Sequence, residues 1–222
     1  MPSKKLVAAI FVPMLAPLLA PLLAMAAQHV DLSTVDKTDF APGGTVRIEG
    51  STGELNIEGW DQPVVEIQTD RYTWSDHAEK AKAGLDRVQV TKKLEGRELT
   101  ITTAHKHFTD IRVNYRILVP RNTKLVVHHG TGSVVVYGVE GDIDATAKVG
   151  DVLVQLNEPA KYQIEASTNL GSIYSDFDGA IHHRRLGIAE TQTPSPEGTG
   201  DLRHVTLHVK VAGGITIQKV AV

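Results

Sequence analysis

The 222-residue chain contains no cysteine, and this absence excludes several kinds of site. Without thiols the protein has no disulfide to restrict its unfolded state, no cysteine nucleophile and no cysteine-based zinc site. An HExxH zinc motif, a glycine-rich phosphate loop and a nucleophile motif are also missing from the sequence. Stability must therefore come from packing and backbone pairing, and we expect no enzyme activity and no cofactor.

The chain also has no excess of basic residues over acidic ones. The chain has 23 Lys and Arg against 26 Asp and Glu, a net charge of −3; without Lys4 and Lys5 the balance is 21 against 26, or −5. Nucleic-acid phosphates favour proteins with a basic face. We therefore expect no nucleic-acid partner.

The first 26 residues have the composition of a secretory signal peptide. Two lysines precede an apolar run from Leu6 to Leu23, and Ala24-Met25-Ala26 provides a small-residue cleavage site. The alternative is a retained membrane anchor, since the run approaches the length of a bilayer span. Three prolines, Pro13, Pro17 and Pro21, disfavour a regular helix in this run. The sequence therefore predicts cleavage, export to the periplasm or cell surface, and no membrane span afterwards.

The remaining residues, 27–222, are predicted to form one β-rich domain. Apolar and polar residues alternate in short segments between Gly and Pro, which is the pattern of half-buried strands. The clearest segments are 45–49, 54–58, 64–69, 88–92, 98–103, 112–119, 205–211 and 215–220.

One segment, Ser75–Arg87, has helical rather than strand periodicity. Asp76 and Glu79 are spaced for a reciprocal N-terminal cap. We predict a helix of about three turns that covers one face or end of the sheets. Its weak apolar stripe consists of Ala78, Ala81, Lys82 and Leu85.

From Leu125 to about residue 180 the sequence repeats. Gly132, Gly141 and Gly150 recur nine residues apart, and each precedes one polar and then one apolar residue. Glycine permits a tight corner, and the residue two positions later is expected to point into the core. Related copies are Gly53-Glu54-Leu55, Gly171-Ser172-Ile173 and Gly213-Gly214-Ile215.

Two nine-residue units make a repeat of 18 residues, close to one coil of a β-solenoid. This geometry would stack Val134 on Val152 and place Ile143 on the opposite wall. The sequence thus predicts an all-β, solenoid-like stack of short strands with one helical insert. An antiparallel β-sandwich is the alternative, because its strands have similar spacing.

The C-terminal part contains a predicted loop and two predicted strands. Gly187–Leu202 is rich in Gly, Pro, Ser and Thr, which is typical of a mobile loop. The strands 205–211 and 215–220 are expected to return and pair with or cap the stack, covering an edge that could otherwise aggregate.

The order of these segments resembles the bacterial adhesin-like families of exported proteins of the DUF4097 type. The resemblance covers roughly Phe40 to Asp176 and implies a β-rich, solenoid-like envelope domain with a proposed role in adhesion. It supplies no catalytic residues. The residues that carry it are Phe40, Gly44-Thr45-Val46, the run from Gly53 to Asp61, Tyr115–Pro120 and the glycine repeat from Gly132 to Ile173.

Ten histidines and several aspartates are candidate metal ligands. His105 and His107 would share one face of a strand, whereas neighbours such as His128 and His129 would point to opposite faces. The adjacent pair His182-His183 is limited in the same way. We predict solvated histidines and no metal site. Turn-forming roles are likewise expected for Asp142, Asp144 and Asp151, because the paired glycines of calcium-binding repeats are missing.

Two further groups have alternative roles. Asp176 and Asp178, near His182, His183, Arg184 and Arg185, could serve a polysaccharide-cleaving enzyme, although a charged strand edge is favoured. Trp60 and Trp74 could stack on sugars, but packing with Tyr72 between helix and sheet is favoured.

We therefore predict an exported, non-catalytic binding or scaffold protein of the cell envelope that contacts an envelope protein or glycan. The alternatives are a regulatory or structural envelope protein acting through protein contacts and, less favoured, a carbohydrate-active enzyme. The sequence does not define the oligomeric state. Residues expected on the outside of the stack are Ser133, Val135, Tyr137, Asp142, Asp144, Asp151 and Ser172.

Overall fold

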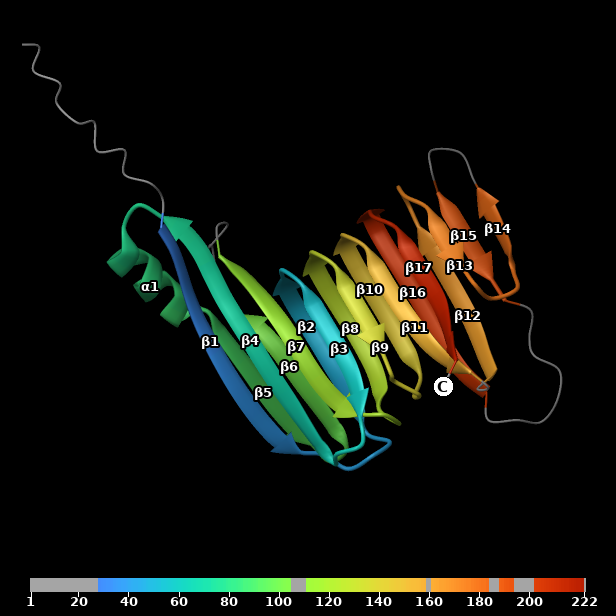
Figure 1. Ribbon diagram of the computed structural model, residues 1–222, viewed down its shortest axis with the longest axis horizontal. Helices are drawn as coiled ribbons and strands as arrows, with labels where there is room; N and C mark the ends of the chain where they lie inside the picture. Colours follow the sequence, from blue (N-terminus) through green and yellow to red (C-terminus); the bar gives the residue numbers. More distant parts are fainter. Residues whose placement is uncertain (1–27, 105–110, 159–160, 184–187, 194–201, 222) are drawn as a thin grey trace, which may run out of the picture.

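The computed structural model describes residues 28–104, 111–158, 161–183, 188–193 and 202–221, which form two facing β-sheets (Figure 1). Sheet A contains, in spatial order, β1 (Gln28–Asp39), β4 (Val64–Ser75), β7 (Arg112–Pro120), β3 (Leu55–Trp60), β9 (Val134–Tyr137), β11 (Val152–Glu158), β17 (Ile215–Ala221) and β13 (Ile173–Ser175). Sheet B contains β14 (Ala180–His183), β15 (Ala189–Gln192), β12 (Lys161–Thr168), β16 (Leu202–Ala212), β10 (Ile143–Val149), β8 (Lys124–Thr131), β2 (Thr45–Thr52), β6 (Glu98–Ala104) and β5 (Gln89–Glu95). The predicted signal peptide, His105, His107, Arg184 and Arg185 lie outside the described residues.

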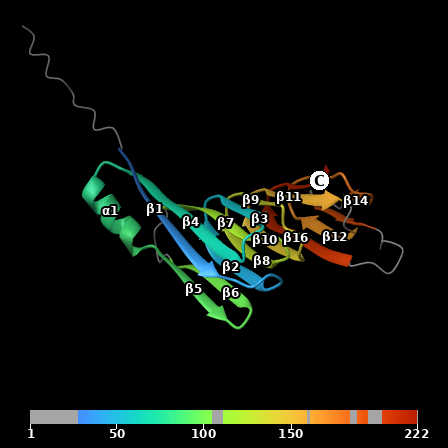
Figure 2. The same ribbon diagram turned by 60° about the horizontal axis from the view of Figure 1, so that its bottom comes forward.

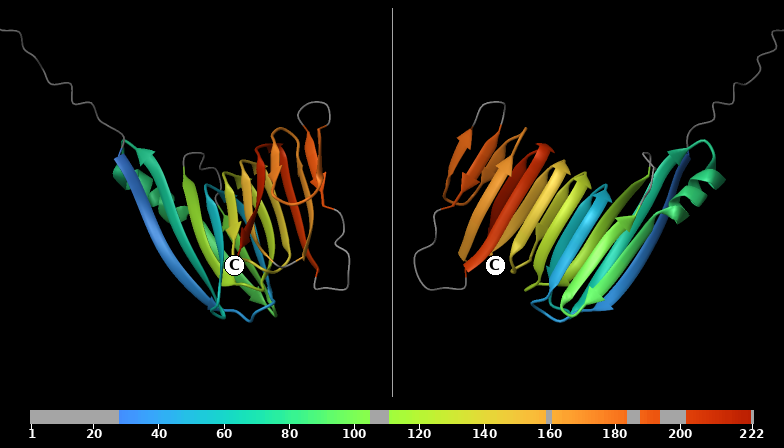
Figure 3. Two further views of the ribbon diagram at one scale, coloured as in Figure 1. Left: turned by 45° about the vertical axis from the view of Figure 1, so that its right-hand side comes forward. Right: turned by 180° about the vertical axis from the view of Figure 1, so that it is seen from behind.

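Six strand pairs build the centre of the molecule. In each pair a strand of sheet B is followed along the chain by a strand of sheet A, and the pairs have the same spatial order in both sheets (Figure 3). Neighbouring pairs are parallel throughout: β6–β7, β2–β3, β8–β9, β10–β11, β16–β17 and β12–β13.

This arrangement confirms the predicted all-β, solenoid-like stack. The antiparallel sandwich is wrong for the centre, since among the described strands antiparallel pairing occurs only toward the ends of the sheets, at β1–β4–β7, β5–β6 and β12–β15–β14. Between β8–β9 and β10–β11, parallel pairing follows from the repeat, because 18 residues return the chain in the same direction at the next position. The pairs β2–β3 and β16–β17, by contrast, join the stack from distant parts of the sequence.

The predicted register is also confirmed. Val134 of β9 pairs with Val152 of β11, and Ile143 lies in the opposite sheet, where it pairs with Leu125. Val134, Val152 and Ile143 are each only 1% exposed. The 18-residue spacing therefore stacks equivalent side chains directly, and their burial supplies the main stabilising energy of the fold.

Inward side chains form continuous columns along the stack. Every member of these columns is buried between the sheets. In sheet A the columns are Tyr115–Leu55–Val134–Val152–Ile215–Ile173 and Ile117–Ile57–Val136–Val154–Ile217. In sheet B they are Leu99–Val46–Leu125–Ile143–Val205–Ile164 and Ile101–Ile48–Val127–Ala145–Leu207–Ala166.

A ladder of glycines forms the corner where the chain crosses from sheet B to sheet A. Gly132 has a φ of 124°, and a Cβ there would lie 1.9 Å from the carbonyl oxygen of Gly53. No other residue fits this combination of positive φ and close backbone approach. Gly141 belongs to the opposite corner, where its hypothetical Cβ would meet the Thr123 carbonyl oxygen at 2.1 Å. The ladder runs Gly53, Gly132, Gly150, Gly213 and Gly171.

The last strand pair returns and pairs with the stack, which was one of the two predicted alternatives, but it does so in the interior and not as a cap at an end. The strands β16 and β17 insert between β10–β11 and β12–β13, with parallel neighbours on both sides. The pair therefore fills an interior position, while the antiparallel β14 and β15 extend sheet B beyond it. The strand β15 lies within the segment predicted as a mobile loop, and its Ala189 is fully buried. Residues 194–201 of that segment lie outside the described residues.

The predicted helix is present as α1 (Ala78–Arg87), against β1 and β4 at one end of the sheets (Figure 2). It buries Ala81, Gly84 and Leu85. The cap predicted from Asp76 and Glu79 is wrong. The N-cap is His77, which makes no side-chain cap bond, and the Ser75 hydroxyl accepts the His77 backbone N–H in a local turn.

The predicted apolar stripe is also partly wrong. Ala78 and Lys82 are exposed, so the buried side of α1 is narrower than the sequence suggested. Within the described part of the chain, no helix is long and apolar enough to cross a membrane.

Candidate binding surface

Four neighbouring strands of sheet A present an uncharged outer surface. Inward and outward residues alternate along β9, β11, β17 and β13. Most of the inward ones belong to the buried columns, but Lys219, in register with Leu156, is exposed, and Ser175 is half-buried. None of the described outward side chains of these strands carries a charge. We call them the neutral panel: Val135, Tyr137, Leu153, Gln155, Asn157, Thr216, Gln218, Val220 and Tyr174.

Parallel register arranges the neutral panel in rows. Tyr137, Gln155 and Gln218 form one row, and the amide of Gln155 donates to the Gln218 side-chain oxygen at 3.0 Å. A neighbouring row contains Val135, Leu153, Thr216 and Tyr174. Adjacent members lie about 4.8 Å apart, which is the spacing of strands in a sheet. The panel thus combines apolar contact area with amides and a hydroxyl at fixed positions.

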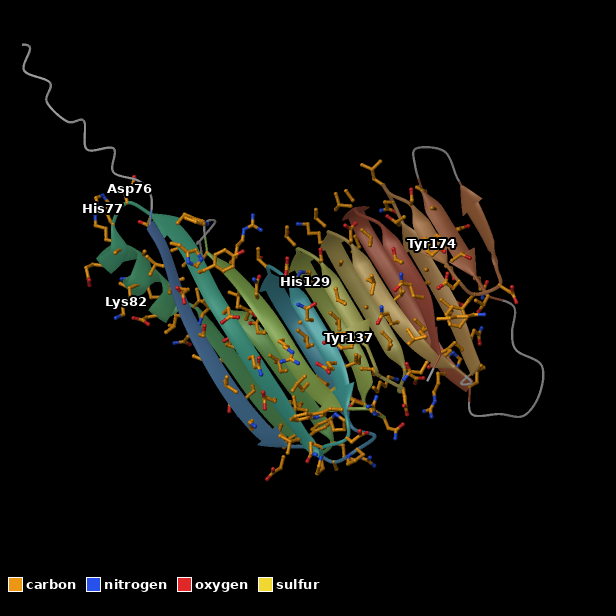
Figure 4. The ribbon with its side chains drawn as sticks, viewed as in Figure 1. Asp76, His77, Lys82, His129, Tyr137 and Tyr174 are labelled. Atoms are coloured by element: carbon orange, nitrogen blue, oxygen red, sulfur yellow. The ribbon has the colours of Figure 1, made fainter. Side chains whose placement is uncertain are left out.

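Two tyrosines provide the largest side chains of the panel (Figure 4). Tyr174 is 60% exposed, and a hydrogen bond with Asp176 raises its pKa. Tyr137 donates to the Glu58 carboxylate at 2.9 Å, and its pKa is raised mainly by burial and further by this bond. Since tyrosine ordinarily ionises near pH 10, both rings are neutral at physiological pH.

Charges begin where the panel ends, and they are paired there. Arg116 Nη2 lies 2.9 Å from Glu58 Oε2, and this bond raises the pKa of Arg116. Farther along sheet A, Lys37 Nζ lies 2.7 Å from Glu66 Oε2 and lowers the pKa of Glu66. On its β3 side the panel is therefore bordered by the Arg116–Glu58 ion pair, and beyond β13 by Asp176, which is hydrogen-bonded to Tyr174.

The outer face of sheet B, unlike the neutral panel, carries charged side chains. Arg47 and Glu98 form an ion pair at 2.9 Å, which raises the pKa of Arg47. Farther along the face is a hollow of about 500 Å³, where the Ser167 hydroxyl and His208 Nδ1 lie 2.7 Å apart. Glu165, Glu190 and Gln192 complete the polar lining of this hollow.

The residues expected on the outside are all exposed or half-buried, but they do not form one surface. Val135 and Tyr137 belong to the neutral panel, whereas Asp144 lies on sheet B. Most panel residues were missed, although strand alternation in 152–158 and 215–220 could have identified them. The missed residues are Leu153, Gln155, Asn157, Thr216, Gln218, Val220 and Tyr174.

Two of the candidate calcium ligands have structural contacts instead. Asp142 Oδ1 accepts the backbone N–H of His204 at 3.0 Å, and Asp151 Oδ1 accepts that of Gly214 at 2.7 Å. Each aspartate thus connects one strand pair to the next. His128 and His129 point to opposite faces of β8, as predicted, but the prediction of solvated histidines is wrong for His129, which is only 3% exposed, whereas His128 is exposed. Within the described ranges, no three His, Asp or Glu residues are grouped to hold a metal ion.

The candidate carboxylate pair does not have the extended geometry on which its prediction depended. The strand β13 ends at Ser175, so Asp176 and Asp178 follow it in a bend. Asp176 Oδ2 accepts the backbone N–H of Lys219 at 3.1 Å, which is a structural contact. The side chains of His182 and His183 lie outside the described residues.

The two tryptophans lie in different strands of sheet A: Trp60 is the last residue of β3, and Trp74 lies near the end of β4. Trp60 Nε1 donates to the Val64 carbonyl at 2.8 Å, at the start of that strand. Trp74, near its end, is 63% exposed, and its ring centroid lies 5.0 Å from that of His29. The predicted packing of both rings between helix and sheet is therefore wrong for Trp74.

No family model matches the chain, and no curated protein sequence does. Solved structures do. A candidate cell adhesion protein from Clostridium sporogenes is 11% identical, with a TM-score of 0.50 over 87% of this chain and 100% of that chain. Candidate adhesins from Parabacteroides merdae and Bacteroides fragilis are 12% and 8% identical over 85% of this chain and 96% and 97% of theirs, with TM-scores of 0.31 and 0.26. At these identities, the likeness to the Clostridium protein shows a shared fold.

Proposed function

We propose that the chain is an exported, adhesin-like binding protein that holds an envelope macromolecule, protein or glycan, against the neutral panel. One observation carries this proposal: nine adjacent outward side chains are uncharged on a sheet whose other outward positions are largely charged or polar. The cell-adhesion description of the Clostridium sporogenes neighbour supports a binding role.

The composition of the neutral panel suits a binding interface. Charged groups lose hydration when a partner covers them, and the cores of protein interfaces are accordingly depleted of charge and enriched in tyrosine. Tyrosine rings also present a flat apolar surface with a polar edge, which suits sugars and protein side chains alike. Gln155, Gln218 and Asn157 can exchange hydrogen bonds with either partner.

The panel is also preorganised. Between β3 and β13, each of its strands except the last has a parallel neighbour on both sides. A partner would therefore bind a surface that is already ordered, which reduces the entropy lost on association. The predicted signal peptide supports placing this surface in the periplasm or at the cell surface.

The test is binding of the purified chain to isolated bacterial envelopes. Leu153→Lys introduces a charge at the centre of the panel and is expected to weaken binding about tenfold or more. The matched control is Thr146→Lys, on the outer face of sheet B, which should bind like the unaltered chain. Equal binding by both variants would contradict the proposal. Protease-treated envelopes distinguish a glycan, which survives the treatment, from a protein.

A further inference from the structure

A cleft opens between the two sheets at the end covered by α1. The strand β1 is the edge of sheet A and β5 the edge of sheet B at this end (Figure 2). Two adjoining cavities of about 430 and 60 Å³ lie between them, and Thr34, Asp36 and Val90 line both. The larger cavity falls within the size range of small-molecule sites.

A guanidinium group lies in this inter-sheet space. Along β4 the inward series contains Ile67 and Thr69, which are 3% and 2% exposed, and Arg71 follows in the same alternation. Arg71 Nη1 donates to the Val88 carbonyl at 2.8 Å. Its Nε is buried and has no hydrogen-bond partner, and Arg71 forms no ion pair with any described residue.

The neighbouring acidic groups do not neutralise Arg71. Asp36 is engaged by Lys92, whose Nζ lies 2.6 Å from Asp36 Oδ1 and also donates to the hydroxyl of Thr38. Asp86 lines the larger cavity, but it is exposed and makes no ion pair with Arg71. An inward guanidinium without an anionic partner is unfavourable unless solvent or a ligand supplies a further acceptor.

The remaining walls offer neutral polar groups. The hydroxyls of Thr34 and Thr69 lie 2.6 Å apart on sheet A. Gln89 and Thr91 of β5 line the opposite wall of the larger cavity and are exposed. A ligand that fits this cleft would carry one negative group for Arg71 and several hydroxyls for the walls.

We propose that the cleft binds an acidic sugar, with Arg71 taking its carboxylate. Guanidinium and carboxylate are planar and match in a two-point hydrogen bond. The Thr34 hydroxyl and the Gln89 amide exchange hydrogen bonds with the ring hydroxyls, whereas the Thr91 hydroxyl already donates to the Thr102 carbonyl oxygen at 3.3 Å. This site is separate from the neutral panel, so an experiment can contradict one of the two binding proposals and leave the other intact.

The test uses the purified full chain titrated with glucuronate, with glucose as the uncharged control and inorganic phosphate as the alternative anion. Chemical-shift changes in an amide NMR spectrum report both affinity and location. Glucuronate should shift residues of β1, β4 and β5 saturably, and glucose should not. Arg71→Met should weaken glucuronate binding about tenfold or more, because a charge-assisted hydrogen bond is lost. Arg116→Met, which removes an exposed guanidinium from the outer face of the same sheet, should leave binding unchanged.

Thermal unfolding separates binding from folding. Glucuronate should raise the melting temperature of the unaltered chain, and Arg71→Met should abolish that rise. The variant alone should melt only slightly lower, because it loses the hydrogen bond to the Val88 carbonyl. Arg71→Lys keeps the charge without the two-point geometry and should bind weakly. Absence of glucuronate binding, equal binding of phosphate, or a marked fall in the melting temperature of both Arg71 variants would each overturn the assignment.

Discussion

The interior of the molecule changes character along its length. Between the central strand pairs the inward side chains are almost entirely aliphatic, as in the column Ile57–Val136–Val154–Ile217. At the α1 end the same inter-sheet space contains Thr34, Thr69, Arg71 and Lys92. One backbone architecture thus supports both a dry stack and a polar cleft.

The difference follows from the position of each strand. A central strand has in-register neighbours on both sides, so its inward residues are enclosed and polar groups there would lose hydration. The edge strands β1 and β5 have one neighbour each, and solvent reaches their inward side chains. The stack supplies stability, and the open end can tolerate groups that serve a ligand.

The largest effect is expected from breaking the glycine ladder. Gly132→Ala places a Cβ 1.9 Å from the Gly53 carbonyl oxygen at a φ of 124°, and should lower the free energy of unfolding by about 4 kcal/mol. Gly96→Ala is the control. Gly96 has a φ of 59°, but a Cβ added there would meet no atom within 4 Å apart from its chain neighbours. The loss of unfolding free energy is therefore expected to be about 1 kcal/mol. Urea denaturation measures both, and similar losses would show that the ladder has no special role.

The next largest effect comes from a cavity in the dry stack. Ile217→Ala should cost about 3 kcal/mol, because Ile217 is fully buried between two parallel neighbours. Thr69→Val, in the wall of the cleft, should change the unfolding free energy by less than about 1 kcal/mol, because the hydroxyl it removes has an exposed partner in Thr34. Comparable costs in a urea titration would contradict the contrast between stack and cleft.

A third prediction concerns His129, a titratable group within the stack. It is 3% exposed, and burial lowers its pKa below the ordinary value of 6.5. The unfolded chain therefore binds a proton more readily, and stability should fall as the pH drops below about 6.5, by at most about 1.4 kcal/mol per pH unit. Urea midpoints of unfolding measured between pH 7 and 5 report this dependence. His129→Gln should make the stability less dependent on pH. If the exposed His128→Gln reduced the pH dependence instead, His129 would not be its cause.

The smallest effect concerns the corner aspartates. Asp151→Ala removes the acceptor of the Gly214 backbone N–H and should cost about 1 kcal/mol. Asp144→Ala, on the exposed face of sheet B, should cost less than about 0.5 kcal/mol. Thermal denaturation of the two variants at equal ionic strength provides the comparison, and a reversed order would remove the structural role assigned to Asp151.

Local spacing explains why much of the stack could be predicted. Glycines 18 residues apart fix both the corner and the register, so the pairing of Val134 with Val152 follows from the sequence alone. Alternation identified most strands because each has one buried side.

The order of the strand pairs could not be predicted in the same way. The alternation of β16 and β17 is compatible with an end position and with the interior one they occupy, since only long-range pairing distinguishes the two. The helix cap was wrong because Ser75, rather than Asp76, bonds the backbone before α1. Arg71 was missed because the predicted strand ended at residue 69, whereas β4 continues to Ser75.

The role of the neutral panel is tested most directly by hydroxyl-radical footprinting of the chain bound to bacterial envelopes. Reactive side chains occur on both outer faces: Tyr137, Leu153 and Tyr174 on sheet A, and His128 and His208 on sheet B. The account predicts that bound envelope protects the first group and leaves the second as reactive as in the free chain. Protection of the histidines with continued oxidation of Tyr174 and Leu153 would contradict it.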